Sequence, residues 1–185
     1  MTAPVWATEF AEIPATLAVC PDLCAAMRVL LAQHELPMKV TEGGDRRAAR
    51  KAILDALFDG RLTLDEAIAQ TEARLPREGS PHHASNLVFA SGWAKRLVHT
   101  HTSVLYTWAV LEALLASGEP RCFVAHSSVE AATSTCTRLL AGRSHDAAVL
   151  RDRLVQCYLA KQPVHAPFVP HHPHCTHVAS PIPRA

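Results

Sequence analysis

The sequence predicts an α+β protein, a predominantly helical bundle with a small antiparallel β-sheet in the C-terminal third. Apolar residues make up 49% of the 185 residues and aromatic residues 5%, with Ala and Leu prominent, a composition that favours helix. Helical periodicity with start and stop signals continues as far as Gly118. Beyond that residue, short β-branched and aromatic segments lie between turn residues, which is typical of a small sheet.

The chain opens with a segment that has no clear period. Residues 1–18 contain two prolines, and we expect them to form an extended arm. Pro21 suits the first position of a helix because its missing N–H is not needed there, and Pro37 ends this helix. Its apolar face consists of Leu23, Met27, Leu30 and Leu31.

A second helix is predicted from Asp45, as its cap, to Phe58, with Gly60 in the left-handed position that closes many helices. Its periodicity places apolar side chains inward (Ile53, Leu54, Leu57 and Phe58) and basic side chains outward (Arg46, Arg47, Arg50 and Lys51). The basic run followed by a turn and a short helix has the outline of a DNA-binding helix-turn-helix. Acidic residues on that short helix would repel phosphate, so we expect no nucleic-acid partner.

Thr63 and Glu66 have the spacing of a capping box and predict the start of this short third helix. A loop rich in Pro, Gly, Ser and His follows at Pro76–Ser85 and is the best internal boundary. We therefore divide the chain into an N-terminal helical lobe, residues 1–80, and residues 81–185, which hold a long central helix, the C-terminal helices and the sheet. Both parts are expected to form one compact domain.

The longest helix is predicted at Asn86–Ser117, with Ser85 as its cap. Apolar residues nearly encircle its second half, which indicates the central helix of a bundle. The stretch Leu97–Ala116 has the length of a membrane span, but it contains polar side chains that would be costly in lipid, among them His99, His101 and Glu112. Because His99 and His101 lie on nearly opposite sides, we expect at least one to be a buried, hydrogen-bonded histidine.

Two further helices are predicted in the C-terminal third. Ser127 and Glu130 form a second capping-box pattern, which predicts a helix to Ala141. Ser144 is expected to start the last helix, which runs through Tyr158. Prolines recur beyond this point and exclude helix from the tail.

Two segments have strand character. Arg121–Ala125 (RCFVA) is partly β-branched and aromatic and is bounded by turn residues. His174–Ala179 (HCTHVA) alternates in polarity and is expected to pair with it. This sheet leaves an open edge.

The composition limits the possible partners and compartment. The net charge of +1 gives little attraction to nucleic acid or to an anionic membrane. The first ten residues lack the features of a secretory signal, so we expect a cytoplasmic protein whose six cysteines are mostly reduced. The sequence also lacks a G-x-S-x-G elbow, a Gly-rich phosphate loop and an H-E-x-x-H motif, and we expect no independent enzymatic activity.

Histidine and cysteine are concentrated in the tail, where imidazole and thiolate could bind zinc or copper. The candidate ligands are His172, His174, Cys175 and His177. Residues two apart in an extended segment share a face, so Cys175 and His177 would point together and His174 away. A closed site would need further ligands, for which Cys122 and His126 are candidates. The alternative is a surface segment with solvated imidazoles.

The remaining cysteines are expected to pack in the core. Cys20 and Cys24 share a helical face if both lie in the first helix, yet their spacing is not that of a C-x-x-C redox motif. Cys136 and Cys157 lie among apolar residues of predicted helices, which indicates small buried hydrophobes.

Three segments resemble the family of the methanobactin biosynthesis protein MbnC. They are Ser91–Val98 (SGWAKRLV), Arg121–Ser127 (RCFVAHS) and His172–Val178 (HPHCTHV), and the resemblance covers roughly residues 85–180. The PHCTHV string is its most specific part.

The resemblance implies an accessory role. Members of that family pair with MbnB, an iron-dependent TIM-barrel enzyme, and the pair converts cysteines of the precursor peptide MbnA into oxazolone and thioamide groups of a copper-chelating peptide. In that scheme the iron belongs to the partner, and this chain binds no cofactor of its own. It would complete the partner's active-site cleft and hold the leader of the precursor peptide.

The predicted sheet is consistent with this role, because open sheet edges capture extended peptides by strand addition. The residues expected to contact partner or peptide are Arg121, Cys122, Phe123, Val124, Ala125, His126, His174, Cys175, Thr176, His177 and Val178. The two hypotheses are therefore a non-catalytic subunit of a peptide-modifying complex and a small metal-binding protein that uses the tail. We favour the first.

Overall fold

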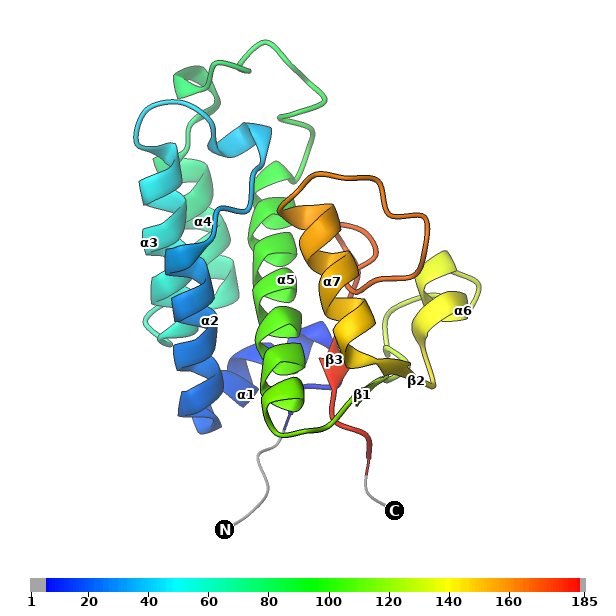
Figure 1. Ribbon diagram of the computed structural model, residues 1–185. Coiled ribbons are helices and arrows are strands. Elements are labelled where there is room, and N and C mark those ends of the chain that lie inside the picture. The colour runs from blue at the N-terminus through cyan, green and yellow to red at the C-terminus, as the bar shows by residue number, and fades with distance from the viewer. Residues whose placement is uncertain (1–5, 184–185) are drawn as a thin grey trace.

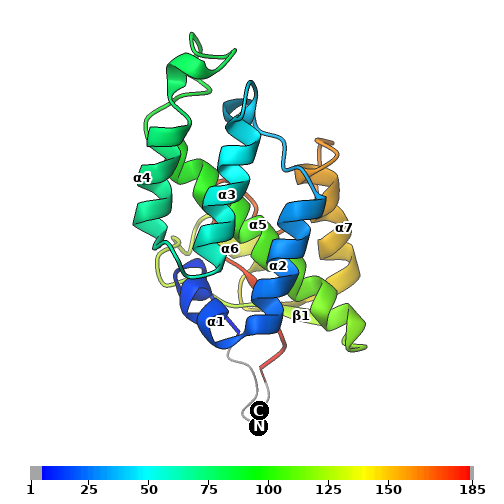
Figure 2. The ribbon, with the colours of Figure 1, turned by 90° about the vertical axis from the view of Figure 1, so that its left-hand side faces the viewer.

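The longest helix, α5 (Trp93–Ala116), lies at the centre of the molecule, because nearly every side chain from Thr100 to Leu111 is buried. Helix α2 and helix α4 pack on it from one side and helix α7 from the other (Figure 1). Figure 2 shows α2, α3 and α4 side by side as one layer over α5. The sequence correctly predicts this helix as the core of the bundle.

The structure, a computed structural model, describes residues 6–183. The other α-helices in this range are α1 (Ile13–Val19), α2 (Pro21–Gln33), α3 (Arg46–Phe58), α4 (Leu64–Arg74), α6 (Thr135–Leu140) and α7 (Ala147–Tyr158). The strands are β1 (Arg121–Val124), β2 (Arg143–Asp146) and β3 (Ala179–Ser180). Short 3-10 turns lie at Phe10–Glu12, Lys39–Thr41 and Arg77–Gly79. The fold is α+β and mainly helical, as predicted.

The arm predicted at residues 1–18 is wrong for its described part, which coils into the 3-10 turn at Phe10–Glu12 and then α1. Pro14 lies in the first turn of α1, where a proline is tolerated. Phe10 and Ile13 are buried in the main core, and this burial stabilises a helical arm that periodicity alone did not predict. Residues 1–5 of the predicted arm lie outside the described part.

Helix α3 begins and ends where predicted, but two of its basic residues do not point outward. Arg46 and Arg50 are 5% and 1% exposed. Arg46 donates to the carbonyl oxygens of Val40, Leu75 and Pro76, at 2.9, 2.9 and 2.6 Å. The guanidinium thus binds carbonyls at the ends of neighbouring elements from inside the fold, and the Pro76 carbonyl also accepts from the Gly79 N–H at 3.2 Å.

The capping box at Thr63 and Glu66 is confirmed, with both reciprocal hydrogen bonds present at the start of α4. The predicted start of the long helix is wrong. Ser85 accepts one N–H bond through its hydroxyl, from Val88, but α5 begins only at Trp93. Gly92 has a φ of +71°, a left-handed conformation that interrupts the helix at this point.

The helix predicted from Ser127 to Ala141 is reduced to α6, which Ser134 caps through its hydroxyl. The proposed capping residues bind other segments instead. The Ser127 hydroxyl lies 2.7 Å from the hydroxyl of Thr176 and donates to Glu9, while the Glu130 carboxylate accepts from the Thr176 N–H. Long-range hydrogen bonds therefore replace the local cap.

The sheet has the order β2-β1-β3, and both pairs are antiparallel. The pairing of the tail with β1 was predicted, but β3 contains two residues rather than the six of His174–Ala179. Ser144, which was predicted to start the last helix, lies in strand β2. Asp146 caps α7 instead, accepting from the Val149 N–H at 2.9 Å.

In residues 6–183, no single helix has both the length and the apolar composition to cross a membrane. The pair Phe10–Val19 and Pro21–Gln33 meets these criteria only jointly, with a bend of 112° between its halves.

Candidate functional site

The central strand β1 presents different side chains to its two faces. Cys122 and Val124 are fully buried, whereas Arg121, Phe123 and Ala125 line an open groove of about 880 Å³. Further apolar side chains of this groove include Trp6, Leu114 and Ile182. Of the predicted β1 residues, Arg121, Phe123 and Ala125 are therefore available to a ligand, while Cys122 and Val124 serve the core.

Strand β1 lies between the other two strands, so β2 and β3 are the two edges of the sheet. The sequence left open which of the two predicted strands forms the edge, and the structure places β1 in the middle of the sheet. On the β3 side, the tail just before β3 pairs with the N-terminal arm. His177 forms an isolated β-bridge with Glu9, and the Phe10 N–H donates to the Thr176 carbonyl. The arm thus covers part of the predicted tail edge, and β2 is the more open side.

Half of the PHCTHV segment faces the interior. Cys175, His177 and Val178 are all buried, whereas His174 is exposed and Thr176 is half-buried. His126, also exposed, packs against Gly142. Any partner that contacts this segment directly would therefore meet His174 and Thr176. The three buried residues could affect such a contact only by keeping the segment in place.

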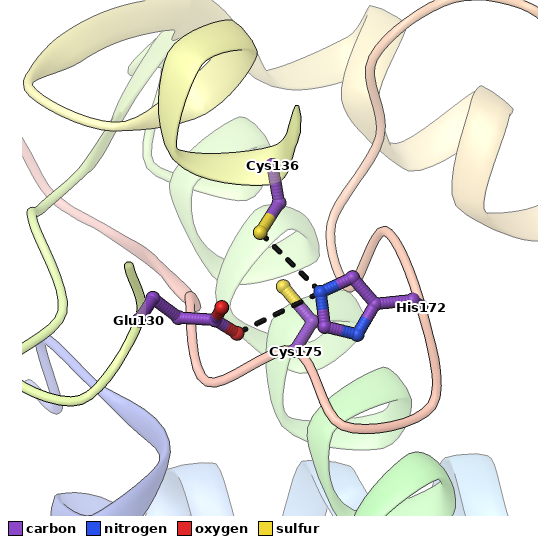
Figure 3. Close-up of side chains that lie close together, drawn as sticks. All are labelled: Glu130, Cys136, His172 and Cys175. Carbon is purple, nitrogen blue, oxygen red and sulfur yellow. Dashed lines mark hydrogen bonds and ion pairs between the residues drawn. The ribbon is translucent and has the colours of Figure 1, made fainter. Parts of the chain in front are cut away.

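The four metal ligands proposed from the sequence do not meet at one point. Their arrangement is replaced by a different cluster, Glu130, Cys136, His172 and Cys175, whose donor atoms all lie within 4.8 Å of one another (Figure 3). The Cys136 Sγ lies 3.3 Å from the His172 Nε2, and the Glu130 Oε1 lies 3.7 Å from the same nitrogen. Two of the four predicted ligands, His172 and Cys175, belong to this cluster.

Three separate segments position these side chains. Cys136 lies in the first turn of α6, and Glu130 lies in the irregular segment before it. His172 and Cys175 are the ends of a tight turn in which the Cys175 N–H donates to the His172 carbonyl at 2.9 Å. The turn brings both side chains to the same side, toward α6.

The two sulfur atoms of the cluster are shielded from solvent. Cys136 and Cys175 are 1% and 2% exposed. Burial, together with the neighbouring Cys136 and Glu130, raises the pKa of the Cys175 thiol to about 12. Burial also lowers the pKa of His177, whose Nδ1 lies 3.6 Å from the Cys175 Sγ.

Other hydrogen bonds hold the cluster from outside. The Ser134 hydroxyl lies 3.1 Å from the Cys136 Sγ, and the Thr176 N–H donates to the Glu130 Oε1 at 3.1 Å. Within residues 6–183, the ion pair of Glu130 is with His172, and no Lys or Arg pairs with it. Among the described residues, the Glu130 carboxylate therefore has no Lys or Arg as an ion-pair partner.

Sequence reasoning missed Glu130 and Cys136, which it assigned to a helix cap and a core position. The H-x-x-C spacing of His172 and Cys175 was the available signal for half of the cluster. It also missed Glu9, whose carboxylate accepts from the Ser128 N–H at 2.8 Å and from the hydroxyls of Ser127 and Ser128. These bonds, led by that of the Ser128 backbone, lower the pKa of Glu9.

No family model matches this chain, and no curated protein or solved structure matches it.

Proposed function

We propose that this chain is a non-catalytic accessory subunit that holds a peptide substrate for a partner enzyme. The partner would be an iron enzyme of the MbnB type and the peptide a precursor of the MbnA type, with the iron and the oxygen chemistry on the partner. Cysteines of that peptide would become oxazolone and thioamide groups of a copper-chelating product. The resemblance in residues 85–180 supports this assignment.

The observation that carries the proposal is the free edge of β2. The Ala147 N–H donates to the Pro120 carbonyl at 2.9 Å, so alternation directs the backbone of His145 toward β1 and that of Ser144 away from the sheet. An extended peptide can accept a hydrogen bond from the outward N–H of Ser144 and add a fourth strand. Ser144 is exposed, which leaves this approach open.

Arg121 restrains the backbone of this edge strand. Its Nη2 donates to the Ser144 carbonyl at 2.9 Å and lies 2.6 Å from the Ser144 hydroxyl. The guanidinium thus restrains the middle of β2 before a peptide arrives, and a restrained strand loses less conformational entropy on binding.

The groove beside β1 is suited to the partner enzyme. Trp6 and Phe123 are partly exposed there and Ile182 is 46% exposed, so the groove offers an apolar surface near the sheet. Apolar surfaces of this kind are typical of protein contacts. In this arrangement the enzyme would meet one face of the sheet while the peptide extends its β2 edge.

The test uses a backbone change that spares the side-chain network as far as possible. Ser144→Pro removes an outward N–H, and Ser144→Ala is its matched control because it keeps that N–H. We expect Ser144→Pro to weaken binding of the precursor leader by roughly three- to tenfold relative to Ser144→Ala, the effect of about one hydrogen bond. Fluorescence anisotropy of a labelled leader peptide measures it, and equal affinities would contradict capture at β2.

Activity is tested separately by co-expression with the iron enzyme and the precursor. Mass spectrometry of the peptide should show modification only when all three components are present. Peptide modification that is unchanged when this chain is omitted would contradict the accessory role.

A further inference from the structure

We propose that Glu130, Cys136, His172 and Cys175 form a structural zinc site that fastens the tail to α6. This site is independent of the proposed peptide-binding role, since it lies in the interior rather than at the β2 edge. It also differs from the four tail ligands that the sequence suggested, because it replaces His174 and His177 with Glu130 and Cys136.

The donor atoms suit this metal. Zinc takes four ligands in a tetrahedron from thiolate, imidazole and carboxylate, which are the three chemistries present. With zinc bonds of about 2.0–2.3 Å, neighbouring donors in a tetrahedron lie about 3.3–3.8 Å apart. Two separations in the structure, 3.3 Å from the Cys136 Sγ to the His172 Nε2 and 3.7 Å from that nitrogen to the Glu130 Oε1, fall in this range.

The charges also favour a cation. Two thiols and a carboxylate converge here, and within the described residues neither a Lys nor an Arg forms an ion pair with the carboxylate. A divalent ion provides the positive charge that would allow both thiols to ionise, since a coordinating thiol is deprotonated outright. The two thiols would then bind the ion as thiolates, and metal binding would release two protons.

Surrounding contacts are those of a built site. The Thr176 N–H orients the Glu130 carboxylate, and the Ser134 hydroxyl and His177 Nδ1 lie beside the two sulfur atoms. Hydrogen bonds of this kind hold ligands in place around metals. The buried Nε2 of His177 has no hydrogen-bond partner among the described residues. A hydrogen bond from the Nδ1–H of the same ring to a Cys175 thiolate would be charge-assisted and would stabilise the buried ring.

The arrangement points to a structural rather than a catalytic ion. Four protein ligands fill a tetrahedron and leave no position for substrate. The half-exposed ring of His172 gives a route for the ion from solvent, while the buried sulfur atoms close the other side. Bound zinc would hold residues 130 and 136 against residues 172 and 175, and so fix the segment that leads into β3.

The experiment uses full-length, tag-free protein prepared under reducing conditions and loaded with zinc alone. After gel filtration, we expect one zinc per chain by elemental analysis. Cobalt in its place should give the intense visible bands of a tetrahedral ion and a thiolate charge-transfer band. Wild-type protein without metal, or with octahedral cobalt, would overturn the proposal.

Variants locate the ion. His172→Ala and Cys136→Ser should weaken zinc binding by more than about 100-fold, beyond what loss of an outer contact causes. The matched controls, His174→Ala and Cys157→Ser, remove the same groups outside the cluster and should keep one zinc per chain. Because His172 is half-exposed, its variant should fold normally by circular dichroism, which separates loss of a ligand from loss of the fold.

Two results would overturn this location. One is zinc retained by the Cys136→Ser and His172→Ala variants, and the other is zinc lost in His174→Ala but not in Cys136→Ser. The second would favour the ligand set in the tail itself. A wild-type protein that captures the leader peptide equally well with and without zinc would leave the site intact, because the two proposals concern different surfaces.

Discussion

Arg50 of α3 and His101 of α5 face each other inside the helical bundle, with 3.5 Å between the Arg50 Nη1 and the His101 Nδ1. Each residue is 1% exposed. The charge of Arg50 is balanced by Glu35, whose Oε2 lies 3.1 Å from the Arg50 Nη2 and whose side chain is 44% exposed. The interior of this bundle therefore contains a cation that reaches its counter-ion at the surface.

The first prediction concerns this buried cation. Arg50→Met replaces a desolvated guanidinium, whose Nε has no hydrogen-bond partner, with an apolar side chain of similar length. We expect the free energy of unfolding to stay the same or rise by up to about 2 kcal/mol, because removing a buried ion pair relieves its desolvation cost. Glu35→Gln should instead lower it by about 1–2 kcal/mol, since the charge on Arg50 then stays buried and uncompensated. Urea unfolding of the two variants decides between these outcomes, and a Met variant less stable than the Gln variant would contradict the account.

Arg46 gives the second prediction, because its guanidinium binds three backbone carbonyls at once. Arg46→Lys keeps the charge but cannot reach all three oxygens from one ammonium group. We expect a loss of about 2–3 kcal/mol in unfolding free energy. Arg47→Lys is the control, since Arg47 is exposed on the same helix and should change stability little. Equal effects of the two substitutions would show that the three carbonyl bonds contribute nothing.

The third prediction concerns pH. Burial, followed by the charge of Arg50, holds the pKa of His101 well below its usual value. Burial likewise lowers the pKa of His99 to about 4. An unfolded chain would protonate both rings near pH 6.5, so their contribution to stability is complete above that pH and is lost as the pH falls.

At about pH 5, keeping the fully buried His101 ring neutral in the fold should cost about 2 kcal/mol relative to pH 7. The His99 ring is only partly buried, so solvent screening should make its cost smaller. Unfolding free energies of the wild type and of His101→Gln at the two pH values measure the effect. The variant should lose less stability on acidification, by roughly the contribution of one ring. Identical pH dependence would refute the buried, neutral state of His101.

The fourth prediction tests the contact between the turn before α3 and the loop before α5. Gly43 has a φ of +94°, and a Cβ there would lie 2.7 Å from the Cδ of Pro81. Gly43→Ala therefore combines a left-handed backbone with a clash against a rigid ring, and we expect a loss of about 2–3 kcal/mol.

Gly60→Ala is the matched control, because Gly60 has a φ of +73° but open space around its Cα. It should cost about 1 kcal/mol from the backbone alone. Adding Pro81→Ala to the Gly43→Ala protein should recover the difference between the two glycine variants. Thermal unfolding measures all three, and no recovery would place the cost elsewhere.

Local signals in the sequence predicted much of the helical lobe. The capping box of Thr63 and Glu66, the boundaries of α3 and the start of α2 at Pro21 depend on neighbouring residues, and all are present in the structure. The wrong predictions concern side chains that bind groups far away in the chain instead of their neighbours. Ser127 and Glu130 form bonds to Glu9 and Thr176 instead of capping a helix, so the pattern was real but its partners lay elsewhere in the chain.

The same reason separates what the sequence determined from what the tertiary structure decided. Composition and periodicity determined an α+β fold around one apolar helix, because burial of a periodic face needs only local order. The approach of Glu130 and Cys136 to His172 and Cys175, and the inward turn of Arg46 and Arg50, depend on packing between segments far apart in the chain. Side chains of these types are stable on a surface as well as in an interior, so only the closed fold decides which of them are brought together.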